Sequence, residues 1–161
     1  MKKAFTLIEL LVYITISTII LFGIVDFIIS IDHMKKRATL IQEVENQGLN
    51  IVNIITQKIR NADYIIGPIV GSPEENLSLN MLSPNAQVVF TLQGTNLEMK
   101  DEFANVEFIN NNLVLVNNLK FINLSKPETQ GSIKIEFTLK YNTTNPIYNY
   151  EKTFYATGSL R

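Results

Sequence analysis

Acidic side chains are the residues of this 161-residue chain that could most readily do chemistry. Two sets of carboxylates could form pairs in the folded chain, Asp63 with Glu74 and Glu75, and Asp101 with Glu102. Paired carboxylates can act as general acid and base or bind calcium. The only histidine is His33 and there is no cysteine, so a metal site would need carboxylate ligands almost alone. We interpret these pairs as solvated loop charges and predict no catalytic residue, metal or cofactor.

Other features of the composition also argue against enzymatic function. The sequence has no glycine-rich phosphate loop and no nucleophile elbow. Without cysteine, disulfide bonds and thiol catalysis are excluded. The formal net charge is −1, which gives no reason to expect nucleic acid as a partner.

A chain of this length has room for one domain with a core of useful size.

One carboxylate lies in an unusual place, inside a long apolar run over residues 5–31. At ~1.5 Å per residue this run can cross the ~30 Å hydrocarbon core of a bilayer as a helix. It exceeds the apolar region of about 7–15 residues in a secretory signal peptide. Asp26 lies near the far end, where it can reach the interface or turn toward protein, but Glu9 lies only one turn into the helix. Taken alone, Glu9 could simply extend toward the lipid head groups.

The residues around Glu9 give it a second interpretation. The start of the chain is Met-Lys-Lys-Ala-Phe-Thr-Leu-Ile-Glu, and it resembles the prepilin signal of the type IV pilin superfamily. That signal has a short basic leader, a small residue, a Phe-Thr-Leu-Ile-Glu core and a long apolar helix. Ala4 stands where the family prefers glycine. The resemblance implies cleavage between Ala4 and Phe5 by a prepilin peptidase, and methylation of the Phe5 amine.

The same resemblance implies a role for Glu9 in subunit assembly. Its i,i+4 spacing from the new amine of Phe5 places both groups on one face of the helix. Because an unpaired carboxylate is costly in the dry core of a filament, this amine on the same or a neighbouring subunit is its expected partner. The other expected partners are further pilin subunits, the inner-membrane assembly platform and membrane lipid. The protein would be a single-pass inner-membrane protein first, and then part of a cell-surface or periplasmic filament.

Beyond residue 31 the helical pattern becomes amphipathic. Apolar or small residues recur at steps of three and four, at Ile41, Val44, Gly48, Ile51, Ile55 and Ile59. This stripe predicts a helix that packs on a sheet and ends near Ala62, before Gly67 and Pro68. The basic residues 35–37 could contact anionic lipid or acidic groups of a neighbour, or could lie on a solvated helix segment.

The rest of the chain alternates with a period of two, which is typical of strands. We predict strands near residues 77–81, 88–92, 97–100, 106–109, 113–116, 119–124, 133–141 and 150–156, with turns at residues 93–96 and 110–112. They would form an antiparallel sheet with one polar face. The expected fold class is therefore α+β: a long N-terminal helix, its first half transmembrane, packed on an antiparallel β-sheet head. The resemblance implies the pilin fold, with a leader at 1–4, a membrane helix at 5–31 and a head at 32–161.

Three functions remain open at this point. The first is a structural subunit, a minor pilin or pseudopilin of a type IV pilus or type II secretion-like filament. The closing residues, Phe154 and Ser159-Leu160-Arg161, resemble the C-termini of J-type pseudopilins and W-type minor pilins. The second is a tip adhesin or DNA-uptake pilin that binds a ligand, for which the tyrosines at 141, 148, 150 and 155 could form a patch, although cross-strand packing also explains them. The third is a membrane-anchored enzyme, for which no catalytic constellation is visible.

Overall fold

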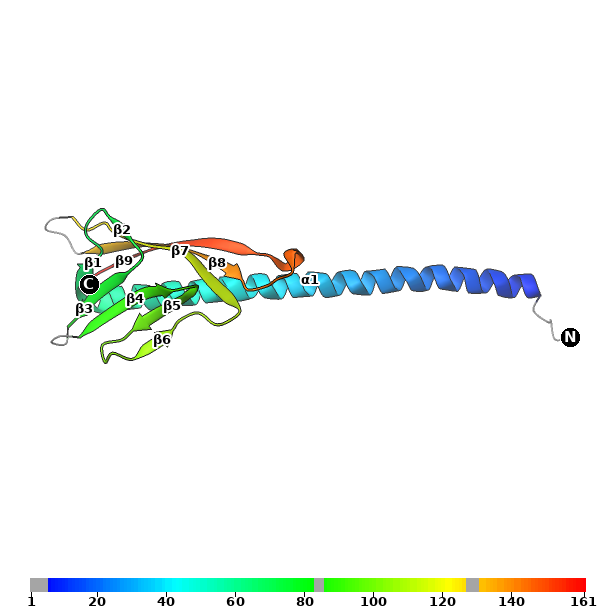
Figure 1. Cartoon of the computed structure of the whole chain (residues 1–161). Coiled ribbons are helices and arrows are strands. Elements are labelled where there is room, and N and C mark those ends of the chain that lie inside the picture. The colour runs from blue at the N-terminus through cyan, green and yellow to red at the C-terminus, as the bar shows by residue number, and fades with distance from the viewer. Residues whose placement is uncertain (1–5, 83–85, 127–130) are drawn as a thin grey trace. The chain divides into compact units, whose positions relative to one another are not determined.

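The computed structural model describes residues 6–82, 86–126 and 131–161, and divides the chain into two compact units between Thr39 and Leu40. Apart from Thr6, the described part of the first unit is one helix, α1 (Leu7–Asn61), which continues into the second unit (Figure 1). The second unit adds the strands β1 (Ala62–Gly67), β2 (Pro73–Glu74), β3 (Leu77–Met81), β4 (Gln87–Gln93), β5 (Asn96–Lys100), β6 (Val106–Phe108), β7 (Val114–Asn123), β8 (Ser132–Tyr141) and β9 (Glu151–Ser159). A short 3-10 helix, η1 (Pro146–Tyr148), precedes β9.

The predicted apolar stripe is the buried face of α1 in the second unit. Val44, Ile51, Ile55 and Ile59 are fully buried, and Gly48 is buried among them. One position differs from the prediction, because Leu40 rather than Ile41 begins the stripe. Leu40 lies one four-residue step before Val44, so the row continues straight where Ile41 falls to its side. The helix ends at Asn61, one residue before the predicted end.

The strands form two antiparallel sheets where one was predicted. The first has the order β1-β3-β4-β5-β6 and the second the order β2-β7-β8-β9. Strands β1 and β2 were not predicted, because the prolines and glycines at 67–73 were interpreted only as a break. β1 follows α1 without a loop, and its run Tyr64-Ile65-Ile66 has the aromatic and β-branched residues that favour a strand.

Turn residues shape the other strands. Gly94, at φ +64°, lies in the predicted turn between β4 and β5, where Gln93 pairs with Asn96. The strands predicted at 113–116 and 119–124 are in fact one strand, β7. Its pairing with β8 shifts register between Asn117 and Lys120, and Asn118 adopts φ +52° there. Asparagine tolerates this left-handed conformation better than most residues, so the chain forms a bulge instead of a break.

Both sheets and α1 share one hydrophobic core. Its largest fully buried side chains include Phe90 on β4, Phe121 on β7 and Phe137 on β8. Tyr141 and Tyr150 are half-buried against it, and the Tyr141 N–H donates to the carbonyl of Tyr150 at 2.9 Å. The prediction of an α+β protein is confirmed, with an apolar N-terminal helix packed on antiparallel sheets in a pilin-like architecture.

A buried asparagine holds the turn after β6. Asn110 is 6% exposed, and its Oδ1 accepts the N–H of Leu97 at 2.7 Å. Its Nδ2 donates to the carbonyl of Val114 at 2.9 Å and also to Asn96 and Asn111. The turn predicted at 110–112 is therefore confirmed, and it depends on a side chain that satisfies backbone groups of two strands.

The helix is fastened to β9 by shape and by charge. The ring of Phe154 lies against Gly48, where an added Cβ would come within 2.1 Å of the ring. The Lys152 Nζ lies 2.6 Å from the Glu45 Oε1. Its hydrogen bond to the Glu45 carboxylate, strengthened by the negative charge, raises the pKa of Lys152. Near these contacts, Asn111 Nδ2 donates to Glu43 Oε1 at 2.7 Å.

Candidate assembly site

The described chain begins with a pair of side chains that cap the helix. Thr6 precedes the first helical residue, and its N–H and hydroxyl each donate to Glu9 Oε2 at 3.0 Å. The Glu9 N–H points back to the Thr6 Oγ1 at 3.4 Å. This is a capping box, in which two side chains three residues apart satisfy N–H groups that the first helical turn leaves unpaired. Glu9 therefore sets the start of α1.

The two oxygens of the Glu9 carboxylate differ in their hydrogen bonds. Both donors from Thr6 reach Oε2, and within the described residues no hydrogen bond to Oε1 occurs. An ionised carboxylate has about four acceptor positions, so the cap leaves several of them open. Glu9 is exposed and lies beside Val12, Tyr13 and Ile16 on the helix surface. A partner covering this face would have to bring a donor to Oε1.

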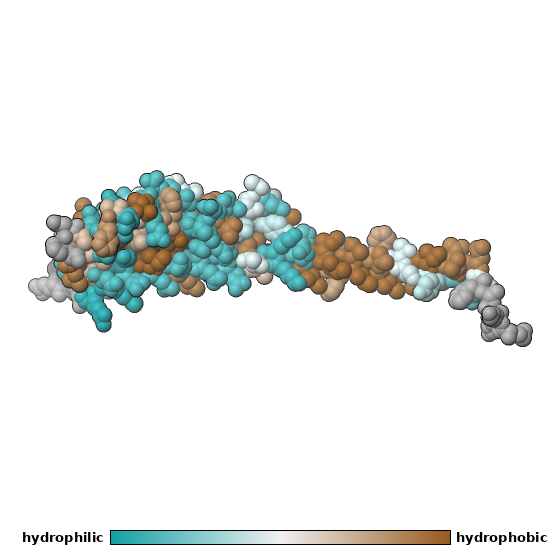
Figure 2. Space-filling model, turned by 90° about the horizontal axis from the view of Figure 1, so that it is seen from below, coloured by the Kyte–Doolittle hydropathy of each residue, from teal (hydrophilic) through white to brown (hydrophobic). Residues whose placement is uncertain are grey.

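The first unit exposes an almost continuous apolar surface, which Figure 2 shows as a brown band. Residues such as Leu7, Phe22 and Phe27 are 65–79% exposed. The hydroxyl groups of two threonines in this band are hydrogen-bonded within the helix. Thr15 donates to the carbonyl of Leu11 and Thr18 to that of Ile14, each at 2.8 Å. By length and composition, this part of the chain can cross a membrane.

The other predicted residues of the N-terminal segment have different outcomes. Ala4 and Phe5 lie outside the described residues, so the cleavage site stays a prediction. Asp26 is exposed on the helix. Lys36, one of the basic residues 35–37, forms an i,i+4 ion pair with Asp32 at 2.7 Å.

One carboxylate of each predicted set, Asp101 and Glu74, binds backbone N–H groups near it in the chain. The Asp101 Oδ1 accepts the N–H groups of Phe103 and Asn105 at 2.9 and 2.8 Å. The side-chain amide of Asn105, with these backbone bonds, lowers the pKa of Asp101. Glu74 accepts the N–H of Ile69 at 3.2 Å. Among residues 6–82, 86–126 and 131–161, no three His, Asp or Glu side chains come together as a metal site would require.

Sequence analysis missed Thr6 as a partner of Glu9. The signal was present, because threonine followed three residues later by glutamate, just before an apolar run, is the sequence signature of a capping box.

Comparison with known proteins agrees with this N-terminal segment. Residues 1–25 match the family model described as the prokaryotic N-terminal methylation motif, which is the prepilin signal of type IV pilins. No curated protein and no solved structure matches the chain significantly. The N-terminal segment is thus that of a type IV pilin-like precursor, and the predicted resemblance to the prepilin signal is confirmed. The motif indicates a structural subunit, with prepilin peptidase and other pilin subunits as its general partners.

Proposed function

We propose that this protein is a structural subunit, a minor pilin or pseudopilin, of a type IV pilus or type II secretion-like filament. The observation that carries the proposal is the methylation motif at residues 1–25, leading directly into an exposed apolar helix. A helix that is apolar nearly all round suits the membrane before assembly and the interior of a filament afterwards. The precursor would span the inner membrane once. An assembly platform would then insert the processed subunit into a filament at the cell surface or in the periplasm.

Processing would create a positively charged partner for the Glu9 carboxylate. Cleavage after Ala4 would leave a positively charged amine on Phe5, which stays charged when methylated. The open Oε1 of Glu9 supports a role as acceptor for this amine on the same or an adjacent subunit, while Oε2 remains bound to Thr6. A subunit inserted at the wrong height would leave the carboxylate unmatched in an apolar environment, so the pair would select the register.

The N-terminus of the membrane-extracted protein tests processing. Expressed with a prepilin peptidase, the protein should begin at Phe5 by intact mass, with or without one methyl group. Without the peptidase it should begin at Met1. Ala4→Gly should be cut at least as completely, and Ala4→Leu should remain uncut because a bulky side chain does not fit where the family has glycine. An N-terminus at Met1 in every case would contradict the proposal.

Two matched variants separate the charge of Glu9 from its capping role. Glu9→Gln keeps an oxygen for the cap but removes the charge, whereas Thr6→Val removes the hydroxyl and keeps the carboxylate. We expect Glu9→Gln to be processed normally but to be lost from sheared filaments, and Thr6→Val to be retained. Equal incorporation of both variants would show that the charge has no role in assembly.

The amount of the subunit in filaments tests the minor class. A minor pilin or pseudopilin should be scarce in sheared filaments, and its deletion should prevent filament formation. Support for this class comes from the ending of the chain and from the absence of a cysteine pair that could close a C-terminal loop. A subunit that dominates the preparation would instead be a major pilin.

A further inference from the structure

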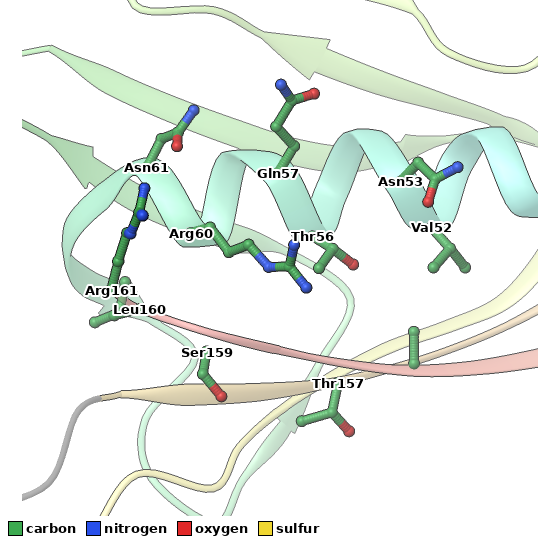
Figure 3. A pocket seen from close by; sticks show the side chains of 11 residues that line it. Val52, Asn53, Thr56, Gln57, Arg60, Asn61, Thr157, Ser159, Leu160 and Arg161 are labelled. Carbon is green, nitrogen blue, oxygen red and sulfur yellow. The ribbon is translucent and has the colours of Figure 1, made fainter.

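A groove of about 950 Å³ runs between the end of α1 and strand β9 (Figure 3). On the helix side, Val52, Thr56 and Arg60 follow one another at four-residue steps and so form a row. On the strand side, Ala156 and Leu160 are half-buried against the core. The groove is therefore apolar at its base and polar along its rim.

The strand wall of the groove is a free sheet edge. Among the strands that the structure describes, β9 pairs only with β8, and it is the last strand of its sheet. Leu160 donates to Gly131, and Tyr150 accepts from Tyr141, so the even-numbered positions are those bonded toward β8. Because an antiparallel strand alternates, the odd-numbered residues Thr157 and Ser159 present their backbone N–H and C=O groups away from β8. Both line the groove, so an extended segment could pair with them there.

The side chains around this edge favour an acidic segment. Arg60 and Arg161 line the groove, and none of its other lining residues in the described part of the chain has a carboxylate side chain. Neither arginine makes an ion pair or side-chain hydrogen bond with another described residue. An added strand with a carboxylate would pair with both guanidinium groups.

The opposite edge of the same sheet has the complementary chemistry. Its outer strand is the two-residue β2, which contains Glu74, and Glu75 follows directly at a bend of the chain. Glu75 is exposed, and within the described residues it has no ion pair. We propose that residues 72–76 of a second copy of this chain add to β9 in the groove, with Glu75 facing Arg60 and Arg161. The four-stranded sheet would then continue from one head to the next, in a head-to-tail contact between two different surfaces of the same chain.

Cross-linking of the full chain in detergent tests this contact directly, because the protein has no cysteine of its own. Thr157→Cys chains are mixed with Asn76→Cys chains and treated with a short thiol-specific cross-linker. A parallel mixture replaces Asn76→Cys with Glu102→Cys, an exposed position in another loop. We expect the 157–76 heterodimer to form in several-fold higher yield than the 157–102 heterodimer. Equal yields would show only that the apolar helices bring copies together, and would overturn the proposal.

Charge reversal provides the second test. In the Thr157→Cys chain Arg60→Glu, and in the Asn76→Cys chain Glu75→Arg, should each lower the yield about tenfold, because like charges would then oppose one another at the interface. Mixing the two reversed chains should restore the yield. If neither reversal changes cross-linking, or if the double reversal does not restore it, residues 72–76 of a second copy are not the occupant of the groove.

Discussion

Gly48 is the position where a single methyl group should have the largest effect on the head. An alanine Cβ there would come within 2.1–2.5 Å of three ring carbons of Phe154, well inside van der Waals contact. That ring has little freedom to move, because it is 7% exposed and stacks on Phe137 with centroids 5.4 Å apart. Gly48→Ala must therefore displace an aromatic side chain of the core.

The size of the effect follows from three opposing contributions. Forcing an extra methyl group into a packed core costs about 1–3 kcal/mol. Losing the stacked geometry of the two rings costs about 0.5–1.5 kcal/mol more. Alanine recovers about 1 kcal/mol because it is a better helix former than glycine. We expect the free energy of unfolding to fall by about 2 kcal/mol.

Urea unfolding of the detergent-solubilised chain, followed by tyrosine fluorescence, measures this change. The signal suits the head because the chain lacks tryptophan, and Tyr141 and Tyr150 lie against the core. Asn50→Ala, on the exposed side of the same helix, is the matched control and should be neutral or slightly stabilising. Adding Phe154→Leu to Gly48→Ala should make the alanine substitution less harmful than it is beside phenylalanine. A Gly48→Ala protein more stable than the parent by about 1 kcal/mol would show that helix propensity alone acts, and would refute the reasoning.

Two further predictions concern polar contacts of the head. Asn110→Leu should lower the free energy of unfolding by about 2–4 kcal/mol in the same urea assay, because the N–H of Leu97 and the carbonyl of Val114 lose their partner; an unchanged midpoint would contradict this. Lys152→Gln should lower the free energy of unfolding at neutral pH. Because the pKa of Lys152 is raised in the folded protein, its contact with Glu45 stabilises the fold only while the lysine is protonated. The difference in stability between variant and parent should therefore shrink as pH rises through that pKa. Urea midpoints of both proteins between about pH 9 and 11.5 would test this, starting below the ordinary lysine pKa of about 10.4, and a difference that grows with pH would reverse the sign.

Periodicity and turn chemistry predicted most of the secondary structure. The stripe on α1 and the alternation in β8 were readable because each residue's own neighbours determine which face is buried. The division into two sheets was not readable, because it depends on contacts between strands distant in sequence. β7 was missed as a single strand for a different reason: two asparagines normally indicate a turn, and only the pairing with β8 keeps the chain extended through Asn118.

The candidate assembly site was predicted only in part. Glu9 was identifiable because a carboxylate in an apolar helix needs an explanation, and the residues around it form a recognisable motif. Its bonds to Thr6 follow from the three-residue spacing of a capping box, which the sequence also contains. The groove beside β9 was beyond sequence reasoning, because its two walls are about 100 residues apart in the chain and neither has an unusual composition.

The packing of Phe154 against Gly48 also affects how the second unit would resist a pulling force. A pull along α1 would load the second unit in shear, so the stripe from Val44 to Ile59 would have to slide as a whole instead of separating one residue at a time. The Phe154 ring over Gly48 opposes that sliding, because every neighbouring position of the helix carries a Cβ that would clash with the ring. Electrostatic anchors at Glu43 and Glu45 lie at the end of the stripe that would take the load first. The head is thus built to hold its helix against axial tension.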